Sequence, residues 1–335
     1  DGVIAVDLSV VQSLIAALGN VYIPEYNQII TSDTFFTLAE SHAEKNFFPG
    51  SSQKKDFLNS VFSSVMGRFL QRKQISYRTL LTGFLENLSQ KHILVAFADS
   101  GIQNVFTVND FSSTLWDGRS QSANTVNDYF GISEANVGVN KVNYFVKRSV
   151  SQDIKIGEKG QIQEHVQITY KNTSTGTWPG GDYKNYLRLI LPLGATISTI
   201  SINKQQQVLL PAIINPTIYE AKNFTPPNGL EIEKTQEENK QLYGFLITVP
   251  TQATKTIDIT YTLSQLFPSD PAPSYSLMFF KQPGIDSFPY SFSFTPTSGY
   301  APLLNGSDAT QLGNDVVLQA TITADKTVRL RFAAK

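Results

Sequence analysis

Cysteine is absent from the 335-residue sequence, so no disulfide framework holds this chain together. A secreted eukaryotic domain of this size usually carries disulfides, and their absence indicates a bacterial protein or a cytosolic one. Charge is also scarce, because Asp, Glu, Lys and Arg make up 16% of the residues, below the usual quarter. Ser, Thr, Asn and Gln fill the shortfall, a composition that suits an extracellular, β-rich surface.

Clusters of positive charge and long apolar runs are missing as well. The net charge is −1 and no run of Lys or Arg occurs, which argues against a nucleic-acid partner. No apolar run approaches the roughly 20 residues that a membrane helix needs, and no signal peptide is present. We therefore expect any membrane anchor or export signal to lie upstream of Asp1, in an N-terminal part that is missing here.

The first third of the chain alternates strands with helices. Residues 3–6 form a short apolar run, and residues 93–98 form another, as is typical of strands buried on both faces. Apolar residues recur with helical spacing in four segments. These predicted helices cover residues 8–18, 32–45, 51–70 and 76–90. The pattern predicts a layered α/β domain over residues 1–141.

From residue 142 onward helical periodicity disappears and strand alternation replaces it. About ten short strands are predicted, separated by turns that contain Gly, Pro and Asn. They cover residues 144–150, 162–170, 186–191, 196–203, 243–249, 256–263, 275–281, 290–294, 316–323 and 328–332. Residues 225–240 are expected to form a long exposed loop. The second domain, over residues 142–335, is therefore predicted to be an all-β antiparallel, Ig-like sandwich.

Motifs of enzyme chemistry are sparse. His42 has Glu40 and Glu44 two residues away on either side, whereas a metal site on a helix needs ligands at i and i+4. Neither a Gly-x-Ser-x-Gly nucleophile elbow nor a Gly-x-x-x-x-Gly-Lys-Ser/Thr phosphate loop occurs. Carboxylates such as Asp99 and Asp128 could meet in space, but a chance meeting is the preferred interpretation. We expect no metal and no cofactor, and we assign no catalytic residue.

One candidate binding site stands at the start of the third predicted helix. Ser51, Ser52, Lys54 and Lys55 fall where backbone N–H groups are free, and the helix dipole disfavours cations there unless an anion is bound. These residues are therefore candidates for binding an anion or a phosphate. The alternative interpretation is that both lysines are solvated surface residues.

Motifs spread over nearly the whole chain resemble the bacterial family known as domain of unknown function 4012. They are DGVIAVD (1–7), LI (14–15), LGNV (18–21), QKKDFL (53–58), DY (128–129), ANVG (135–138), NK (140–141), YFVKR (144–148), PLGA (192–195) and KQPG (281–284). The resemblance implies an exported protein that an N-terminal membrane helix anchors at the extracellular face of the bacterial cell envelope. It also implies that this chain is the C-terminal part of such a protein.

Residues 1–70 are more distantly similar to the LytR-CpsA-Psr phosphotransferases, which transfer glycopolymers from polyprenyl-pyrophosphate carriers to the cell wall. The shared features are Val-Asp, a Leu-Gly-Gly-Val-like turn and a basic helix start. Here the turn reads Gly19-Asn20, and Lys54 with Lys55 stand where that family has an arginine pair. Lysine offers a point charge in place of a bidentate fork. The Asp and Arg that the family places upstream are not in this chain.

Two functions of different classes follow. In the first, the chain is a non-catalytic surface protein with a structural, adhesive or assembly role. Its partners are then a cell-wall or surface glycopolymer or other envelope proteins. In the second, the first domain binds polyprenyl-pyrophosphate-linked sugars and acts as a phosphotransferase. We favour the first, because the guanidinium groups of the second chemistry are missing. A deep apolar groove beside Lys54 and Lys55 would favour the enzyme.

Overall fold

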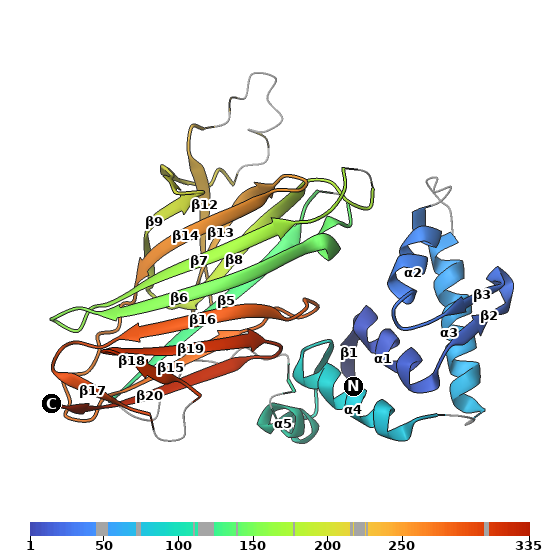
Figure 1. Cartoon of the computed structure of the whole chain (residues 1–335), viewed down its shortest axis with the longest axis horizontal. Helices are drawn as coiled ribbons and strands as arrows, with labels where there is room; N and C mark the ends of the chain where they lie inside the picture. The colour runs from blue at the N-terminus through green and yellow to red at the C-terminus, as the bar shows by residue number, and fades with distance from the viewer. Residues whose placement is uncertain are drawn as a thin grey trace. The chain divides into compact units, whose positions relative to one another are not determined.

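The computed structural model describes residues 1–44, 53–71, 75–109, 111–112, 124–138, 140–176, 178–214, 217, 225, 227–304 and 308–335. The chain divides into two compact units, Asp1–Leu115 and Trp116–Lys335, and each is described by itself (Figure 1). This division lies earlier in the chain than the expected boundary after residue 141. The strand β5, over Thr125–Asn136, belongs to the second unit.

The first unit is mainly helical. Its described elements are β1 (Gly2–Val6), α1 (Leu8–Leu18), β2 (Val21–Ile23), the 3-10 helix η1 (Pro24–Tyr26), β3 (Gln28–Ile30), α2 (Phe35–Glu44), α3 (Gln53–Leu70), α4 (Tyr77–Ser89), β4 (Ile93–Phe97) and α5 (Ser100–Val108). The helix predicted over residues 8–18 is confirmed as α1. α5 was not predicted. None of the described helices has both the length and the apolar character needed to span a membrane.

The core of the first unit forms where α1, α2 and α3 meet the β2–β3 hairpin. Figure 1 shows α2 and this hairpin beside α3. The buried side chains come from the apolar faces that the helical spacing predicts. They include Ile15 and Leu18 of α1, Ile23 and Ile30 of the hairpin, Phe35 of α2, and Phe57, Val61 and Val65 of α3.

The prediction of a layered α/β domain is wrong. All five residues of β1 are exposed, and β1 pairs antiparallel with β4 in a two-stranded sheet. The other sheet of this unit, β2 with β3, also has two strands in the described part of the chain. An apolar run shows that a strand could be buried on both faces, but it does not show that other elements cover those faces.

Asp7 fixes the junction between β1 and α1. Its Oδ1 accepts the Ser9 N–H at 2.9 Å as an N-cap, and its Oδ2 lies 2.6 Å from Nδ1 of His92. Burial alone would raise the pKa of Asp7, but the hydrogen bond and charge of His92, with the Ser9 bonds, lower it below its usual value. The ionised form of Asp7 therefore stabilises the folded unit.

We expect Asp7→Ala to lower the free energy of unfolding of the first unit by about 1 kcal/mol, since a cap is lost. Because the pKa of Asp7 is lowered in the folded state, the stability that its charge contributes is present at neutral pH. It is lost as the pH falls below about 4. Asp7→Asn, which keeps a capping oxygen, should abolish that acid dependence. Urea unfolding followed by the helical circular dichroism signal measures both effects. Equal acid dependence in Asp7→Asn and the wild type would contradict this assignment.

The second unit is a sandwich of two eight-stranded sheets in its described part. Besides β5 it contains the 3-10 helix η2 (Val142–Phe145), β6 (Val146–Ile156), β7 (Ile162–Asn172), β8 (Tyr183–Pro192), β9 (Thr196–Ile202), β10 (Gln205–Gln206), β11 (Leu209–Pro211), β12 (Leu230–Glu237), β13 (Lys240–Val249), β14 (Thr254–Thr262), β15 (Ser274–Phe280), β16 (Phe288–Thr295), β17 (Tyr300–Leu303), β18 (Thr310–Leu312), β19 (Asp315–Ile322) and β20 (Lys326–Ala334).

The two sheets lie face to face (Figure 1). One, the β6–β7 sheet, has the order β10-β9-β14-β7-β6-β16-β19-β18. The other, the β5–β8 sheet, has the order β11-β12-β13-β8-β5-β15-β20-β17. Alternate residues of the strands point between the sheets and form a single apolar core. In β7, for example, buried residues alternate with partly buried ones along most of its length.

The prediction of an all-antiparallel sandwich is also wrong. β15 pairs parallel with β5, β16 pairs parallel with β6, and β11 pairs parallel with β12, so both sheets are mixed. Alternation within a strand shows which face it buries, but it is the same for parallel and antiparallel partners. β12 lies inside the segment expected to be a loop. Its charged residues are compatible with a strand because the first half of β12 is only partly buried and its second half is solvent-exposed.

Candidate functional site

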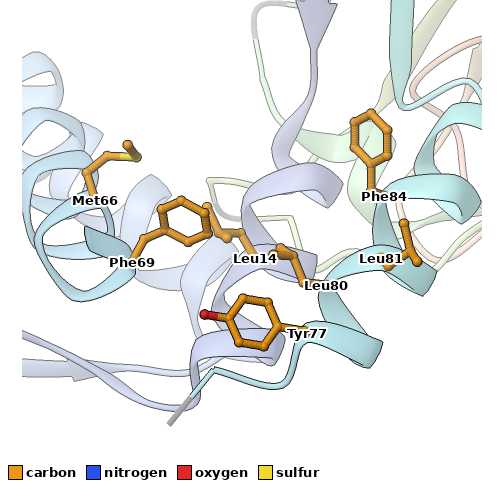
Figure 2. Close-up of a pocket in the computed structure, with 7 residues that line it drawn as sticks. All are labelled: Leu14, Met66, Phe69, Tyr77, Leu80, Leu81 and Phe84. Carbon is orange, nitrogen blue, oxygen red and sulfur yellow. The ribbon is translucent and has the colours of Figure 1, made fainter. Parts of the chain in front are cut away.

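An apolar pocket on the first unit is the candidate functional site. Figure 2 shows side chains from α1, α3 and α4 that line it. The pocket has a volume of about 570 Å³. Its lining residues are Leu14 of α1, Met66 and Phe69 of α3, and Tyr77, Leu80, Leu81 and Phe84 of α4. The Tyr77 hydroxyl is the one oxygen that these seven side chains carry.

Hydrogen bonds between α1 and α4 place the two helices that line much of the pocket. The buried amide of Asn87 donates to Ser13 Oγ at 2.8 Å and to the Gly83 carbonyl at 2.6 Å. At the other end of α4, the Ser76 N–H donates to the Ala17 carbonyl at 3.0 Å. A Cβ at position 83 would lie 3.3 Å from the Ser13 Cβ, so glycine permits this close approach.

The α4 helix exposes much of the apolar face that its sequence pattern would bury. Tyr77 and Leu81 are 61% and 62% exposed, and Phe84 is 50% exposed. Leu88, by contrast, is buried beside β4. Exposed apolar residues that occur singly are ordinary, whereas a contiguous group beside a cavity indicates a binding surface.

The chemistry of this pocket is that of a hydrocarbon site. A ligand with hydrogen-bonding groups would lose its hydration there with almost no partner in return, which costs free energy. A hydrocarbon chain loses no hydrogen bonds and gains about 0.8 kcal/mol for each methylene group that it buries. The seven lining residues include no charged side chain. This lining is suited to binding a hydrocarbon chain.

The predicted anion site stands elsewhere on α3. Ser51 and Ser52 lie outside the described residues, and so do the side chains of Lys54 and Lys55. The backbone of both lysines belongs to the first turn of α3, as predicted. Met66 follows Lys54 by twelve residues, which corresponds to about 18 Å along the helix. This pocket is therefore not the groove beside Lys54 and Lys55 that would favour the enzyme.

The histidines have structural partners. His42 Nε2 lies 3.0 Å from Gln28 Oε1, and its ring stacks on Phe57 with centroids 4.3 Å apart. His165 lies 3.6 Å from Asp153 and 3.4 Å from Asp258 on the partly exposed side of β7. Across the described residues, no group of three or more His, Asp or Glu side chains is arranged to hold a metal ion.

Sequence reasoning missed the pocket, because helical apolar spacing over residues 76–90 indicates a face that is buried against the rest of the domain. The signal that could have found it is the surplus of apolar residues on α4. Leu81 and Leu85 extend the apolar stripe beyond the width that packing against α1 alone covers.

No protein-family model matches this sequence, and no curated protein matches it. Among solved structures, a candidate nutrient binding protein from Legionella pneumophila is 10% identical, with a TM-score of 0.39 over 62% of this chain and 71% of that one. Yeast LTA4 hydrolase in complex with bestatin is 9% identical, with a TM-score of 0.34 over 59% and 31%. An M1 zinc metallopeptidase from Deinococcus radiodurans is 9% identical, with a TM-score of 0.24 over 56% and 42%. At these levels of similarity we infer nothing about function from them.

Proposed function

We propose that this is an envelope-associated protein of the bacterial cell surface with a structural, adhesive or assembly role. In this proposal the helical unit binds the hydrocarbon chain of an envelope component. The observation that carries it is the pocket of about 570 Å³, which is lined by six apolar side chains and Tyr77. The composition, with few charges and no cysteine, supports an extracellular bacterial setting. Surface glycopolymers or other envelope proteins are the proposed partners of the assembly.

The energetics of the pocket suit a chain of modest length. A ligand that buries about six methylene groups would gain about 5 kcal/mol before the entropy cost of association is subtracted. Leu14 of α1 and Phe69 of α3 line the pocket and pack against the core of the first unit. The exposed Leu81 and Phe84 of α4 would be covered by the ligand. Binding would thus remove exposed apolar area from both partners.

The alternative function, transfer of polyprenyl-pyrophosphate-linked sugars, would use the same pocket for the polyprenyl chain. A pyrophosphate at Lys54 and Lys55 would then lie about 18 Å along α3 from Met66. One ligand would have to span that distance for both sites to act together. We therefore favour a binding role over phosphoryl transfer.

Binding of the neutral fluorescent hydrocarbon probe N-phenyl-1-naphthylamine to the full chain tests the proposal. Leu81→Asp places a carboxylate in the pocket without disturbing the helical core, since Leu81 is 62% exposed. We expect it to weaken probe binding at least about tenfold, equivalent to 1.4 kcal/mol. Val105→Asp is the matched control, because Val105 of α5 is 60% exposed and does not line the pocket. Equal binding by both variants would contradict the proposal.

A second comparison separates the two functions. Native mass spectrometry with a polyprenyl pyrophosphate and with the corresponding polyprenol measures whether the headgroup adds affinity. The binding role predicts that Lys54→Ala with Lys55→Ala leaves both affinities unchanged. A selective loss of pyrophosphate binding in that variant would favour the transferase instead.

A further inference from the structure

Two carboxyl groups meet in the core of the sandwich. Asp128 of β5 and Glu164 of β7 are both completely buried, at 0% exposure. β5 and β7 belong to opposite sheets, so the pair bridges the sandwich. The two groups are close enough for each to act on the pKa of the other. Buried carboxyl groups are rare unless they are paired or hydrogen-bonded, so the partners of each oxygen decide how the pair is stabilised.

Three of the four carboxyl oxygens already accept hydrogen bonds. Asp128 Oδ1 accepts the Tyr129 N–H at 2.7 Å, and Asp128 Oδ2 accepts the Tyr275 hydroxyl. Glu164 Oε2 accepts the Tyr261 hydroxyl and the Gln152 amide, both at 2.7 Å. Glu164 Oε1 has no donor among the described residues. It is therefore the oxygen that can carry a proton and donate it.

Among the described residues, no positively charged group acts on this pair. The polar groups that face it from the neighbouring strands are Gln152 of β6, Tyr261 of β14 and Tyr275 of β15. The next polar group is Tyr290 of β16, whose hydroxyl donates to Gln152 Oε1 at 2.8 Å. Besides Asp128 and Glu164, the only charged group among the described residues that acts on Tyr290 is Asp153. Two carboxylates in contact at low dielectric, without a cation, repel each other too strongly for both to stay ionised.

We propose that Glu164 is protonated at neutral pH and donates from Oε1 to the Asp128 carboxylate, so that one shared proton joins the two sheets. Loss of this proton in alkaline solution leaves two buried carboxylates in contact and weakens the sandwich. The pair is thus a pH-sensitive contact between the two sheets of the second unit.

The direction of the pKa shift agrees with this geometry. Burial, and then the negative charge of Asp128, raise the pKa of Glu164 well above its usual value, while the Tyr261 and Gln152 hydrogen bonds oppose the rise. The folded chain therefore keeps a proton that the unfolded chain releases above about pH 4.3. Between that pH and the folded-state pKa, stability falls as the pH rises, and the unfolding constant increases up to about tenfold per pH unit.

Glu164→Gln is the matched variant, because its amide nitrogen can donate to Asp128 while its oxygen still accepts from Tyr261 and Gln152. We would measure denaturant unfolding of the full chain and of this variant between about pH 5 and pH 9. The ratio of the wild-type unfolding constant to that of the variant should rise by up to about tenfold per pH unit. Titrating groups that do not interact with Glu164 cancel in this ratio. A ratio that is constant with pH would overturn the proposal.

Infrared spectroscopy of the wild-type protein provides a measurement that does not depend on the folding of a variant. A protonated carboxylic acid has a carbonyl stretch above the amide I band, and isotope-labelled glutamate shifts it. We expect this labelled band at neutral pH and its loss on alkaline titration. If the folded protein at neutral pH shows only carboxylate bands, Glu164 is ionised and no proton is shared with Asp128.

Discussion

Replacing Arg148 by methionine is expected to lower the free energy of unfolding of the sandwich by about 3–5 kcal/mol. Arg148 of β6 places Nη2 2.9 Å from Glu134 Oε2 of β5, and the two side chains are 10% and 3% exposed. Glu134 also accepts the hydroxyls of Tyr170 and Tyr183, at 2.7 and 2.9 Å. Removing the guanidinium leaves a buried carboxylate without its counter-charge, which two tyrosine hydroxyls do not replace.

Chemical denaturation of the full chain, followed by intrinsic fluorescence, measures this loss. Lys147→Met is the control, because Lys147 neighbours Arg148 on β6 but is exposed, and we expect a change within about 0.5 kcal/mol. Adding Glu134→Gln to Arg148→Met should recover part of the loss, since the unpaired charge is then removed. If the single variant were as stable as the control, the ion pair would not contribute as the geometry indicates.

Phe294→Ala is expected to cost about 3–5 kcal/mol in the same unit. Phe294 of β16 is completely buried and contacts a group of aromatic rings between the sheets. Its ring centroid lies 4.8 Å from that of Tyr275, 5.1 Å from that of Phe332 and 6.1 Å from that of Phe267. Truncation would open a cavity that these rigid rings cannot close.

Leu246→Ala on β13 is the matched control for this cavity, because Leu246 is 60% exposed in the same sandwich. Its effect should stay within about 0.5 kcal/mol. Equilibrium unfolding with urea gives both values from the shift in midpoint at constant slope. A loss below about 1 kcal/mol for Phe294→Ala would show that the core repacks, contrary to the close aromatic contacts.

Local periodicity predicted many individual elements of this chain. The helix over residues 8–18 and the strand over residues 162–170 correspond to α1 and β7, because each shows its burial pattern directly in its own sequence. Strand direction was not predictable in this way. The parallel partners β5 and β15 are far apart in sequence, and their pairing depends on crossovers that no single strand encodes.

The exposure of β1 was hidden for a related reason. Its apolar residues resemble those of a buried strand, but burial depends on neighbours that the strand itself does not specify. The pocket and the carboxyl pair also arise from tertiary contacts. One signal for the pair was present, since Glu164 falls in register with Ile162 and Val166 on the inward face of β7. A charged residue on a buried face indicates a partner across the core.

The claim that the helical unit binds a hydrocarbon chain is tested most directly by photo-crosslinking. A long-chain alcohol with a terminal diazirine would be bound to the full chain, irradiated, and its attachment sites identified by mass spectrometry of the peptides. We predict labelling at the α3 and α4 residues that line the pocket, Phe69 and Leu80 among them, and its loss in Leu81→Asp. Labelling that is concentrated on the sandwich, or that Leu81→Asp leaves unchanged, would contradict the account.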